Sequence, residues 1–197
     1  MKKNFLFAGL YIFSFLILLI QFNCTSGSKT MTKEEQIARG KYLVTFGGCN
    51  DCHSPKIITQ MGPVPDTTKL LSGHPTDQPL MPFDTNLVAP GRWVLTNGAT
   101  TEWIGPWGVS FSANLTPDSS TGLGAWTLDN FIKTMRTGQH LGTGRRLLPP
   151  MPWMGIGSLN DEDLAALFAY LQSIPPVSNR VPAPIPPNMI AAHFKMK

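Results

Sequence analysis

The chain has 197 residues, with 16 basic and 12 acidic residues and a formal net charge of +4. Lys2 and Lys3 precede a long apolar stretch. Because these two lysines contribute to the net charge, the rest of the chain has only a small excess of positive charge. The sequence has no run of basic residues, so a nucleic-acid partner is not expected. Only three cysteines are present, too few for a four-cysteine zinc site or a disulfide-dense scaffold. The length suits a single domain behind a short leader.

The first 23 residues have the layout of an export signal. Lys2 and Lys3 are followed by apolar residues 5–20, and the next charge is Lys29. This order predicts a cleaved signal peptide, or a retained anchor that is barely long enough to span a bilayer. Both alternatives place the chain beyond about residue 30 on the exported, periplasmic side of a membrane, because the lysines stay inside. Residues 24–31 are interpreted as a linker.

Cys24 directly follows the apolar stretch, where a bacterial lipoprotein carries its lipid-modified cysteine. The usual lipobox has leucine three residues before the cysteine and a small residue next to it, whereas here Gln21 and Asn23 stand there. Three alternatives stay open: lipidation of Cys24, signal cleavage without a lipid, and a retained anchor. Acylation would remove an unpaired thiol from an oxidising compartment.

The first predicted helix lies directly before a cysteine pair. Thr32 and Glu35 form a capping-box pattern, which predicts a helix from this point to about Phe46. The two glycines at 47–48 break the helix, and a C-x-x-C-H run at Cys49, Cys52 and His53 follows.

This C-x-x-C-H run is typical of covalent haem c attachment. Cys49 and Cys52 can each add to one haem vinyl group, and His53 can supply an axial nitrogen to the iron. A thioredoxin-like redox pair would need a strand before the motif, a structural zinc site would need more ligands, and a small disulfide loop would not need His53. One motif predicts one haem.

The middle of the chain, residues 54–114, is rich in proline and glycine and is predicted to be mostly irregular but wrapped on a core. Within it, residues 92–101 carry Asn-Gly between β-prone residues, which indicates a possible short hairpin. Four aromatic side chains of this stretch are not all expected to face water, and filling space in the core is favoured over a specific role, although a flat cofactor also needs such cover: Trp93, Trp103, Trp107 and Phe111.

Two further helices are predicted towards the C-terminus. Thr127 can cap a helix over 128–137 that stops at Gly138. Asn160 and three acidic residues can open a last helix that prolines 175–176 end. The tail over 178–197 is proline-rich and is predicted to be an extended strap or disordered.

A second axial ligand decides what a haem protein does. Methionine sulfur gives an electron-transfer haem with a raised reduction potential, whereas an exchangeable position gives ligand binding or catalysis. Met151 is the strongest candidate, because prolines on both sides stiffen its loop. The lesser candidates are Met154, His74, His140 and Met81, and Met151 could also be a packing residue.

The order of these features resembles a class I mono-haem cytochrome c. The stretch 111–118, with 121–124 and Trp126, is similar to the haem domains of bacterial membrane-associated cytochromes c, including cytochrome subunits of dehydrogenases. The segments 135–138, 150–152 and 160–164 continue the resemblance, which covers about residues 33–176.

What the resemblance implies is an all-α cytochrome c fold with helices around one haem and a long irregular insertion, over a domain at 32–177. It implies thioether bonds at Cys49 and Cys52, with His53 and Met151 as axial ligands. It also implies that the first and last helices cross, Gly40 allowing close approach of Leu167 and Tyr170.

The resulting functional hypothesis is an electron carrier rather than an enzyme. It would be exported, tethered to a membrane by lipid or anchor, and would pass single electrons between redox partners, a dehydrogenase or a terminal oxidase. The alternative is a peroxidase-like haem enzyme with a releasable distal ligand, in which His140 could be imagined as the acid–base group.

Overall fold

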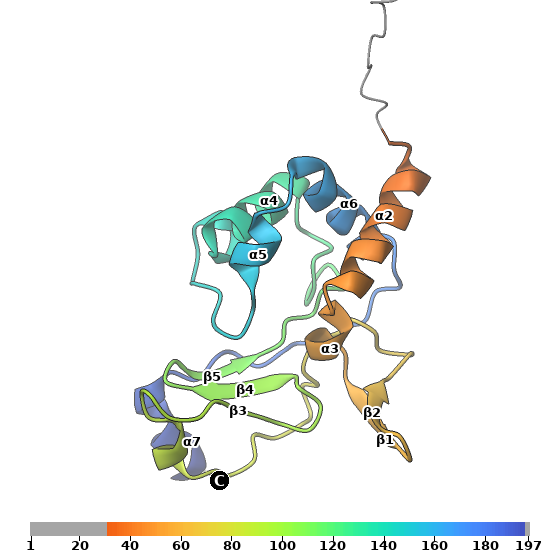
Figure 1. The fold of residues 1–197 in the computed structure, drawn as a ribbon. Coiled ribbons are helices and arrows are strands. Elements are labelled where there is room, and N and C mark those ends of the chain that lie inside the picture. Colours follow the sequence, from red (N-terminus) through yellow and green to blue (C-terminus); the bar gives the residue numbers. More distant parts are fainter. Residues whose placement is uncertain (1–30, 196–197) are drawn as a thin grey trace, which may run out of the picture. The chain divides into compact units, whose positions relative to one another are not determined.

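The computed structural model describes residues 31–195, and the predicted export signal and Cys24 therefore lie outside the described residues. The helices are α2 (Lys33–Phe46), α3 (Cys49–His53), α4 (Leu128–Thr137), α5 (Trp153–Gly157), α6 (Asp161–Leu171) and α7 (Ile190–Lys195) (Figure 1). The strands are β1 (Lys56–Thr59), β2 (Gly62–Pro65), β3 (Leu95–Thr96), β4 (Glu102–Gly105) and β5 (Gly108–Phe111). Over the described range, no helix has both the length and the apolar character that crossing a bilayer requires.

The predicted helix starts are confirmed by hydrogen-bonded caps. Thr32 Oγ1 accepts from the backbone N–H of Glu35, and the Glu35 carboxylate accepts from the backbone N–H of Thr32 at 2.8 Å. Thr127 and Asn160 cap α4 and α6 in the same way with one side-chain oxygen each. These bonds satisfy amide groups that have no partner inside the helix.

Helices α2 and α6 cross at very short range (Figure 1). A Cβ added to Gly40 would lie 2.0 Å from the carbonyl oxygen of Ala166 and 2.7 Å from Cβ of Tyr170. The implied crossing at Gly40 is therefore present, because only glycine allows this approach; Tyr170 takes part as implied, but the nearest atoms belong to Ala166 rather than Leu167. The crossing forms part of a buried apolar core that α4 completes; its members are Leu43, Val44, Leu71, Leu123, Phe131, Met135, Leu164, Leu167 and Leu171.

The last long helix ends earlier than predicted. The prolines at 175–176 were expected to terminate it, but α6 ends at Leu171. The backbone N–H of Ser173 bonds to the carbonyl of Tyr170 at 2.9 Å, a tighter turn that closes the helix before the prolines. The predicted end of α4 is confirmed, since Gly138 adopts a left-handed φ of 66°.

Two small antiparallel sheets occupy the stretch that was predicted to be mostly irregular. The predicted hairpin is present as β3 paired with β4, but its connection covers residues 97–101 and β5 extends the sheet. Strands β1 and β2 form a second hairpin, which was not predicted. The three-stranded sheet and α7 share a separate small core, and the all-α description therefore applies only to the helical part; that core comprises Leu80, Val88, Ile104, Val109 and Ile190.

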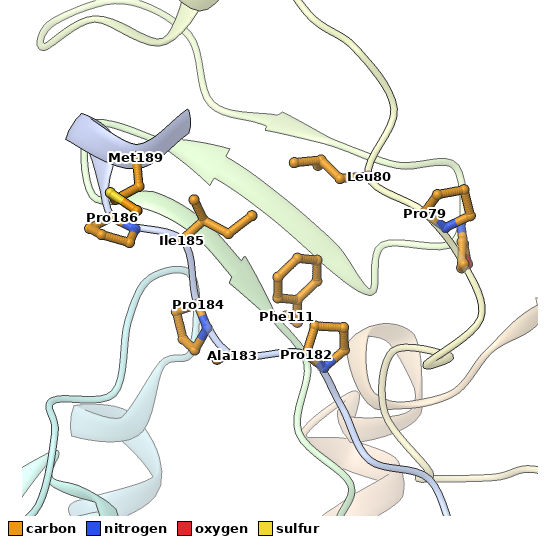
Figure 2. A pocket seen from close by; sticks show the side chains of 10 residues that line it. Pro79, Leu80, Phe111, Pro182, Ala183, Pro184, Ile185, Pro186 and Met189 are labelled. Carbon is orange, nitrogen blue, oxygen red and sulfur yellow. The ribbon is translucent and has the colours of Figure 1, made fainter. Parts of the chain in front are cut away.

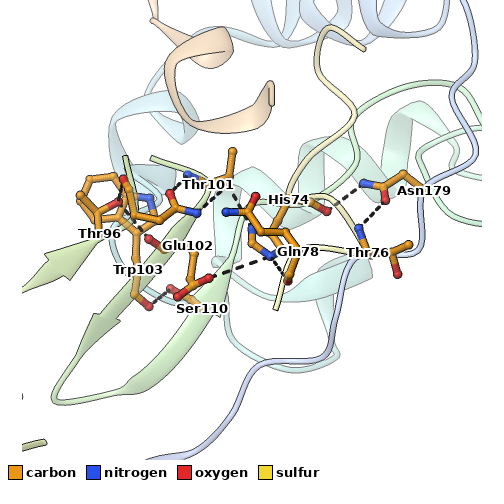
Figure 3. A network of polar contacts seen from close by, with 10 residues as sticks. His74, Thr76, Gln78, Thr96, Thr101, Glu102, Trp103, Ser110 and Asn179 are labelled. Carbon is orange, nitrogen blue, oxygen red and sulfur yellow. Dashed lines mark hydrogen bonds and ion pairs between the residues drawn. The ribbon is translucent and has the colours of Figure 1, made fainter. Parts of the chain in front are cut away.

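Residues 178–186 form an extended strap, one of the two predicted outcomes, whereas the rest of the described tail is helical, with a short 3-10 turn at Pro187–Met189 followed by α7, which was not predicted. Asn179 holds it in place: its side-chain nitrogen donates to the carbonyls of Ser72 and His74 at 2.6 and 2.9 Å, and its oxygen accepts from the Thr76 amide (Figure 3). Farther along, Ile185 and Val109 exchange two backbone hydrogen bonds, which join the strap to β5. The strap thus ties the helical part to the sheet.

Candidate haem site

The C-x-x-C-H residues form their own short helix, α3. Gly48 precedes it with a left-handed φ of 63°, so the chain turns sharply after α2. Cys49 and Cys52 are free thiols, and burial raises the pKa of both. A thioredoxin-like pair instead needs a thiol of lowered pKa and a preceding strand, and here α2 precedes the motif.

His53 is buried and oriented by one hydrogen bond. Its side chain is 8% exposed, and Nδ1 lies 2.8 Å from the carbonyl oxygen of Ala113. A carbonyl can only accept, so Nδ1 carries the proton and the lone pair of Nε2 is free. Burial also lowers the pKa of His53, which keeps the imidazole neutral. A neutral, oriented imidazole is the form that binds iron.

Gly73 lies between the C-x-x-C-H motif and the segment around Ala113, and it allows the two to approach closely. The Gly73 amide donates to the carbonyl of His53 at 2.7 Å. A Cβ at Gly73 would lie 2.5 Å from the Ser112 carbonyl oxygen, and its φ of 81° is left-handed, so glycine is required here. This contact fixes the distance between α3 and the strand end that orients His53.

One cavity brings the four predicted cofactor residues together. Cys49, Cys52 and His53 line it, and Met151 contributes to the same wall. Much of the remaining wall is apolar and comes from α2, α4 and α6; these residues are Val44, Phe131, Met135, Leu167 and Leu171. Two free thiols, a neutral imidazole and a thioether around an apolar cavity fit the donor set of a covalently attached haem.

The loop that carries Met151 is fixed to the sheet. Ser110 Oγ in β5 donates to the carbonyl oxygen of Pro149 at 2.6 Å. The backbone N–H of Trp153 donates to the Met151 carbonyl at 2.9 Å. The Met151 side chain is half-buried against the helical core. Arg145, at the start of the loop, also lines the cavity.

Several known proteins with related sequences are subunits of dehydrogenases. A subunit of the nicotinate dehydrogenase of Pseudomonas putida is 42% identical over 78 residues, 40% of this chain and 6% of its own. The gluconate 2-dehydrogenase cytochrome c subunit of Pantoea cypripedii is 31% identical over 143 residues, which are 72% of this chain. The fructose dehydrogenase cytochrome subunit of Gluconobacter japonicus is 34% identical over 93 residues, 47% of this chain and 18% of its own.

The chain is related to cytochrome c subunits of dehydrogenases. The matched part spans about a quarter of the gluconate 2-dehydrogenase subunit, 24% of its length, and less of the other two relatives. No family model matches the chain.

The lesser ligand candidates lie away from the cavity that the cysteine pair lines. Met154 and Met81 are 71% and 63% exposed, and neither lines it. His140 packs edge-on against Trp126 at 5.1 Å between ring centroids, also outside the wall. None of these three side chains is therefore brought together with the cysteine pair.

His74 is fully buried, and both of its ring nitrogens are already engaged. Nε2 lies 3.3 Å from the Gln78 carbonyl and Nδ1 lies 3.0 Å from Thr101 Oγ1, so a neutral ring donates to one and accepts from the other (Figure 3). The Glu102 carboxyl lies 4.0 Å away, and burial raises its pKa to about 7. His74 is thus a structural residue of the sheet region.

A second methionine of the cavity wall was not among the candidate ligands named from the sequence. Met135 on α4 is 9% exposed and lines the cavity together with Met151. It follows Phe131 by four positions on the buried face of α4, and that spacing could have placed it in the core. Of the four aromatic residues expected to give cover, Trp103 and Phe111 line the cavity, whereas Trp93 is 69% exposed.

A second apolar cavity adjoins the first. Its wall is built from residues 78–80, Phe111 of β5 and the strap, with Met189 at one end (Figure 2). Phe111 and Pro184 line both cavities, so they separate the two spaces. The second cavity contains neither a thiol nor a histidine, and it does not fit haem attachment.

Residues 31–195 contain no cluster of three or more histidine, cysteine, aspartate or glutamate side chains that could hold a metal ion.

Proposed function

We propose that the chain is a mono-haem cytochrome c, with a cytochrome c fold, that transfers single electrons. Cys49 and Cys52 would attach the haem, His53 Nε2 would bind one face of the iron, and the Met151 sulfur would bind the other. The observation that supports this proposal is the shared cavity. All four side chains line it, although Met151 follows His53 by 98 residues.

When bound, the haem supplies an iron that alternates between its ferric and ferrous states. The residues of the chain hold this group rather than react with it. Ala113 fixes the His53 ring, Ser110 fixes the Met151 loop, and the apolar wall excludes water. A stiff and dry environment keeps the change of structure between the two oxidation states small, which suits electron transfer.

A haem enzyme is the second candidate and is less well supported. Such an enzyme needs an exchangeable iron position and a nearby acid–base group. Among the described residues, the ionisable side chains of the cavity wall are Cys49, Cys52, His53 and Arg145. The first three belong to the attachment motif, and an arginine does not release its proton in proteins. The geometry therefore favours the carrier.

The partners and the location follow from the relatives and from the N-terminal sequence. Because the related proteins are cytochrome subunits of dehydrogenases, we infer that this chain accepts electrons from a dehydrogenase and passes them on, for instance towards a terminal oxidase. The signal-like segment supports export to the periplasmic side, with a tether through lipidated Cys24 or an N-terminal helix.

Spectra of the protein produced in a host that attaches haem c test the central proposal. We expect the mass to increase by one haem, a low-spin spectrum with a methionine–iron absorption band, and slow binding of carbon monoxide to the reduced form. Absence of covalent haem would refute the cytochrome. Covalent haem with rapid carbon monoxide binding and no methionine band would refute the carrier and favour the enzyme.

The tether has its own test. Fractionation of cells that produce the full chain should place it with membranes, and Cys24→Ser should release it if the tether is a lipid. Retention of the Cys24→Ser protein in the membrane fraction would instead support an N-terminal anchor.

A further inference from the structure

The C-terminal end of α3 is held by residues of the stretch 54–114, whose role the sequence left open. A helix leaves its last carbonyl groups without partners inside the helix, and those of α3 surround the predicted iron ligand His53. Lys56, three residues after His53, donates hydrogen bonds to carbonyl groups at this end of the helix through its ammonium group. Its Nζ donates to the carbonyls of Asn50, Asp51 and Ser54 at 3.0, 2.9 and 2.8 Å.

This contact uses the full hydrogen-bonding capacity of Lys56. A lysine ammonium has three N–H donors, and each of the three bonds goes to a carbonyl in or directly after α3. Other caps come from the same stretch of chain: Thr100 Oγ1 also donates to the Asp51 carbonyl, and the Gly73 amide donates to that of His53. Helix α3 is thus enclosed by groups that compensate the negative ends of its peptide dipoles.

Lys56 also brings a positive charge to this end of the helix. A cation near a helix C-terminus interacts favourably with the peptide dipoles. The same charge interacts with an iron bound to His53, because the ferric haem carries one more positive charge than the ferrous haem. A fixed cation nearby disfavours the ferric state and so raises the reduction potential.

We propose that Lys56 is a positioning residue of the haem-binding unit, which fixes α3 through three carbonyl groups and raises the reduction potential of the iron through its charge. The proposal rests on the proposed function, since it needs haem on Cys49, Cys52 and His53. It also assigns a role to the insertion: its residues complete the attachment helix.

The test compares reduction potentials of purified holoproteins. Lys56→Met removes the charge and the donors but keeps an unbranched apolar stem. We expect it to shift the equilibrium at least threefold towards the oxidised form, which is roughly 30 mV for a one-electron couple. Lys56→Arg keeps the charge and should retain most of the potential. Lys69→Met removes an exposed lysine of the same stretch and should leave the potential unchanged.

A second readout separates positioning from charge. Amide hydrogen exchange in α3 should become faster in Lys56→Met and remain unchanged in Lys69→Met. If Lys56→Met is not recovered with haem, Lys56→Gln, which keeps two donors without the charge, should show the lower potential.

If Lys56→Met has the same reduction potential as Lys69→Met, the role of the charge is overturned. Where only Lys56→Gln is recovered with haem, it takes the place of Lys56→Met in this comparison. Unchanged α3 exchange would overturn the positioning role. Both outcomes presuppose a wild-type protein with six-coordinate haem. Failure of the wild type itself to carry haem would instead refute the proposed function.

Discussion

The hydroxyl group of Ser110 and the carbonyl oxygen of Pro149 lie 2.6 Å apart, which joins strand β5 to the loop that carries Met151. The same hydroxyl accepts from Trp107 Nε1 at 3.2 Å, and of its two carbonyl acceptors Pro149 is much closer than Trp103, whose oxygen is 3.5 Å away. Ser110 and Pro149 line the same cavity as the α3 residues. The sheet therefore has a direct part in holding the proposed distal ligand.

Replacing Ser110 by alanine should loosen this loop. A typical hydrogen bond contributes about 1 kcal/mol net, so the methionine–iron bond should become roughly fivefold easier to displace. Titration of the oxidised holoprotein with imidazole measures this displacement. Ser173→Ala removes an exposed hydroxyl that bonds to its own helix end and serves as the control. Equal titration curves for the two variants would mean that the bond does not restrain Met151.

Replacing Met151 by alanine should open one face of the iron. The methionine–iron absorption band should disappear, the reduction potential should fall, and carbon monoxide should bind rapidly to the reduced form. Two other methionines provide matched controls. Met154→Ala changes an exposed side chain of the same loop region, and Met135→Leu changes the second methionine of the cavity wall. If the iron opens in Met135→Leu but not in Met151→Ala, the ligand assignment is wrong.

Replacing Gly40 by alanine should destabilise the protein. The added methyl group would overlap the backbone of α6 at Ala166, and such overpacking costs about 1–3 kcal/mol. Urea unfolding monitored by circular dichroism measures the loss. Gly155→Ala is the control, because a Cβ at that helical glycine meets nothing within 4 Å. A Gly40→Ala protein as stable as the wild type would show that α2 and α6 can separate without cost.

The features of this molecule that the sequence predicts are those that depend on residues close to one another in the sequence. The caps at Thr32, Thr127 and Asn160 each depend on a bond that spans three residues, and all three were foreseen. The attachment motif is similarly local. The proximity of Met151 to it was expected from family resemblance rather than from spacing, and the structure does place both in one cavity wall.

The parts that the sequence does not predict depend on distant contacts. Strand β2 contains Pro63 and Pro65, which argue against a strand; a two-stranded hairpin accepts them because each strand has a free edge. The bond between His53 and Ala113 joins residues 60 positions apart. Lys56 has no helical or strand pattern that marks its contact with α3. Such long-range pairs form only once the irregular segment is packed.

The buried Glu102 should make stability depend on pH. Burial raises its pKa from the ordinary value of 4.5 to about 7, so the folded protein favours the neutral carboxyl. This contribution is fully present below pH 4.5 and is lost as the pH rises through 7.

Glu102→Gln removes this ionisation and keeps a neutral side chain of similar shape. We therefore expect the free energy of unfolding of Glu102→Gln, measured relative to that of the wild type, to increase by up to roughly 3 kcal/mol as the pH rises from 4.5 to 8. The neighbouring His74 has a pKa lowered by burial and acts in the opposite direction, losing stability as the pH falls below 6.5. Because His74 remains in both proteins, the difference between their urea unfolding curves at the two pH values reports the ionisation of Glu102 together with its coupling to His74. A difference that does not change with pH would show that the pKa of Glu102 is the same in the folded and the unfolded protein.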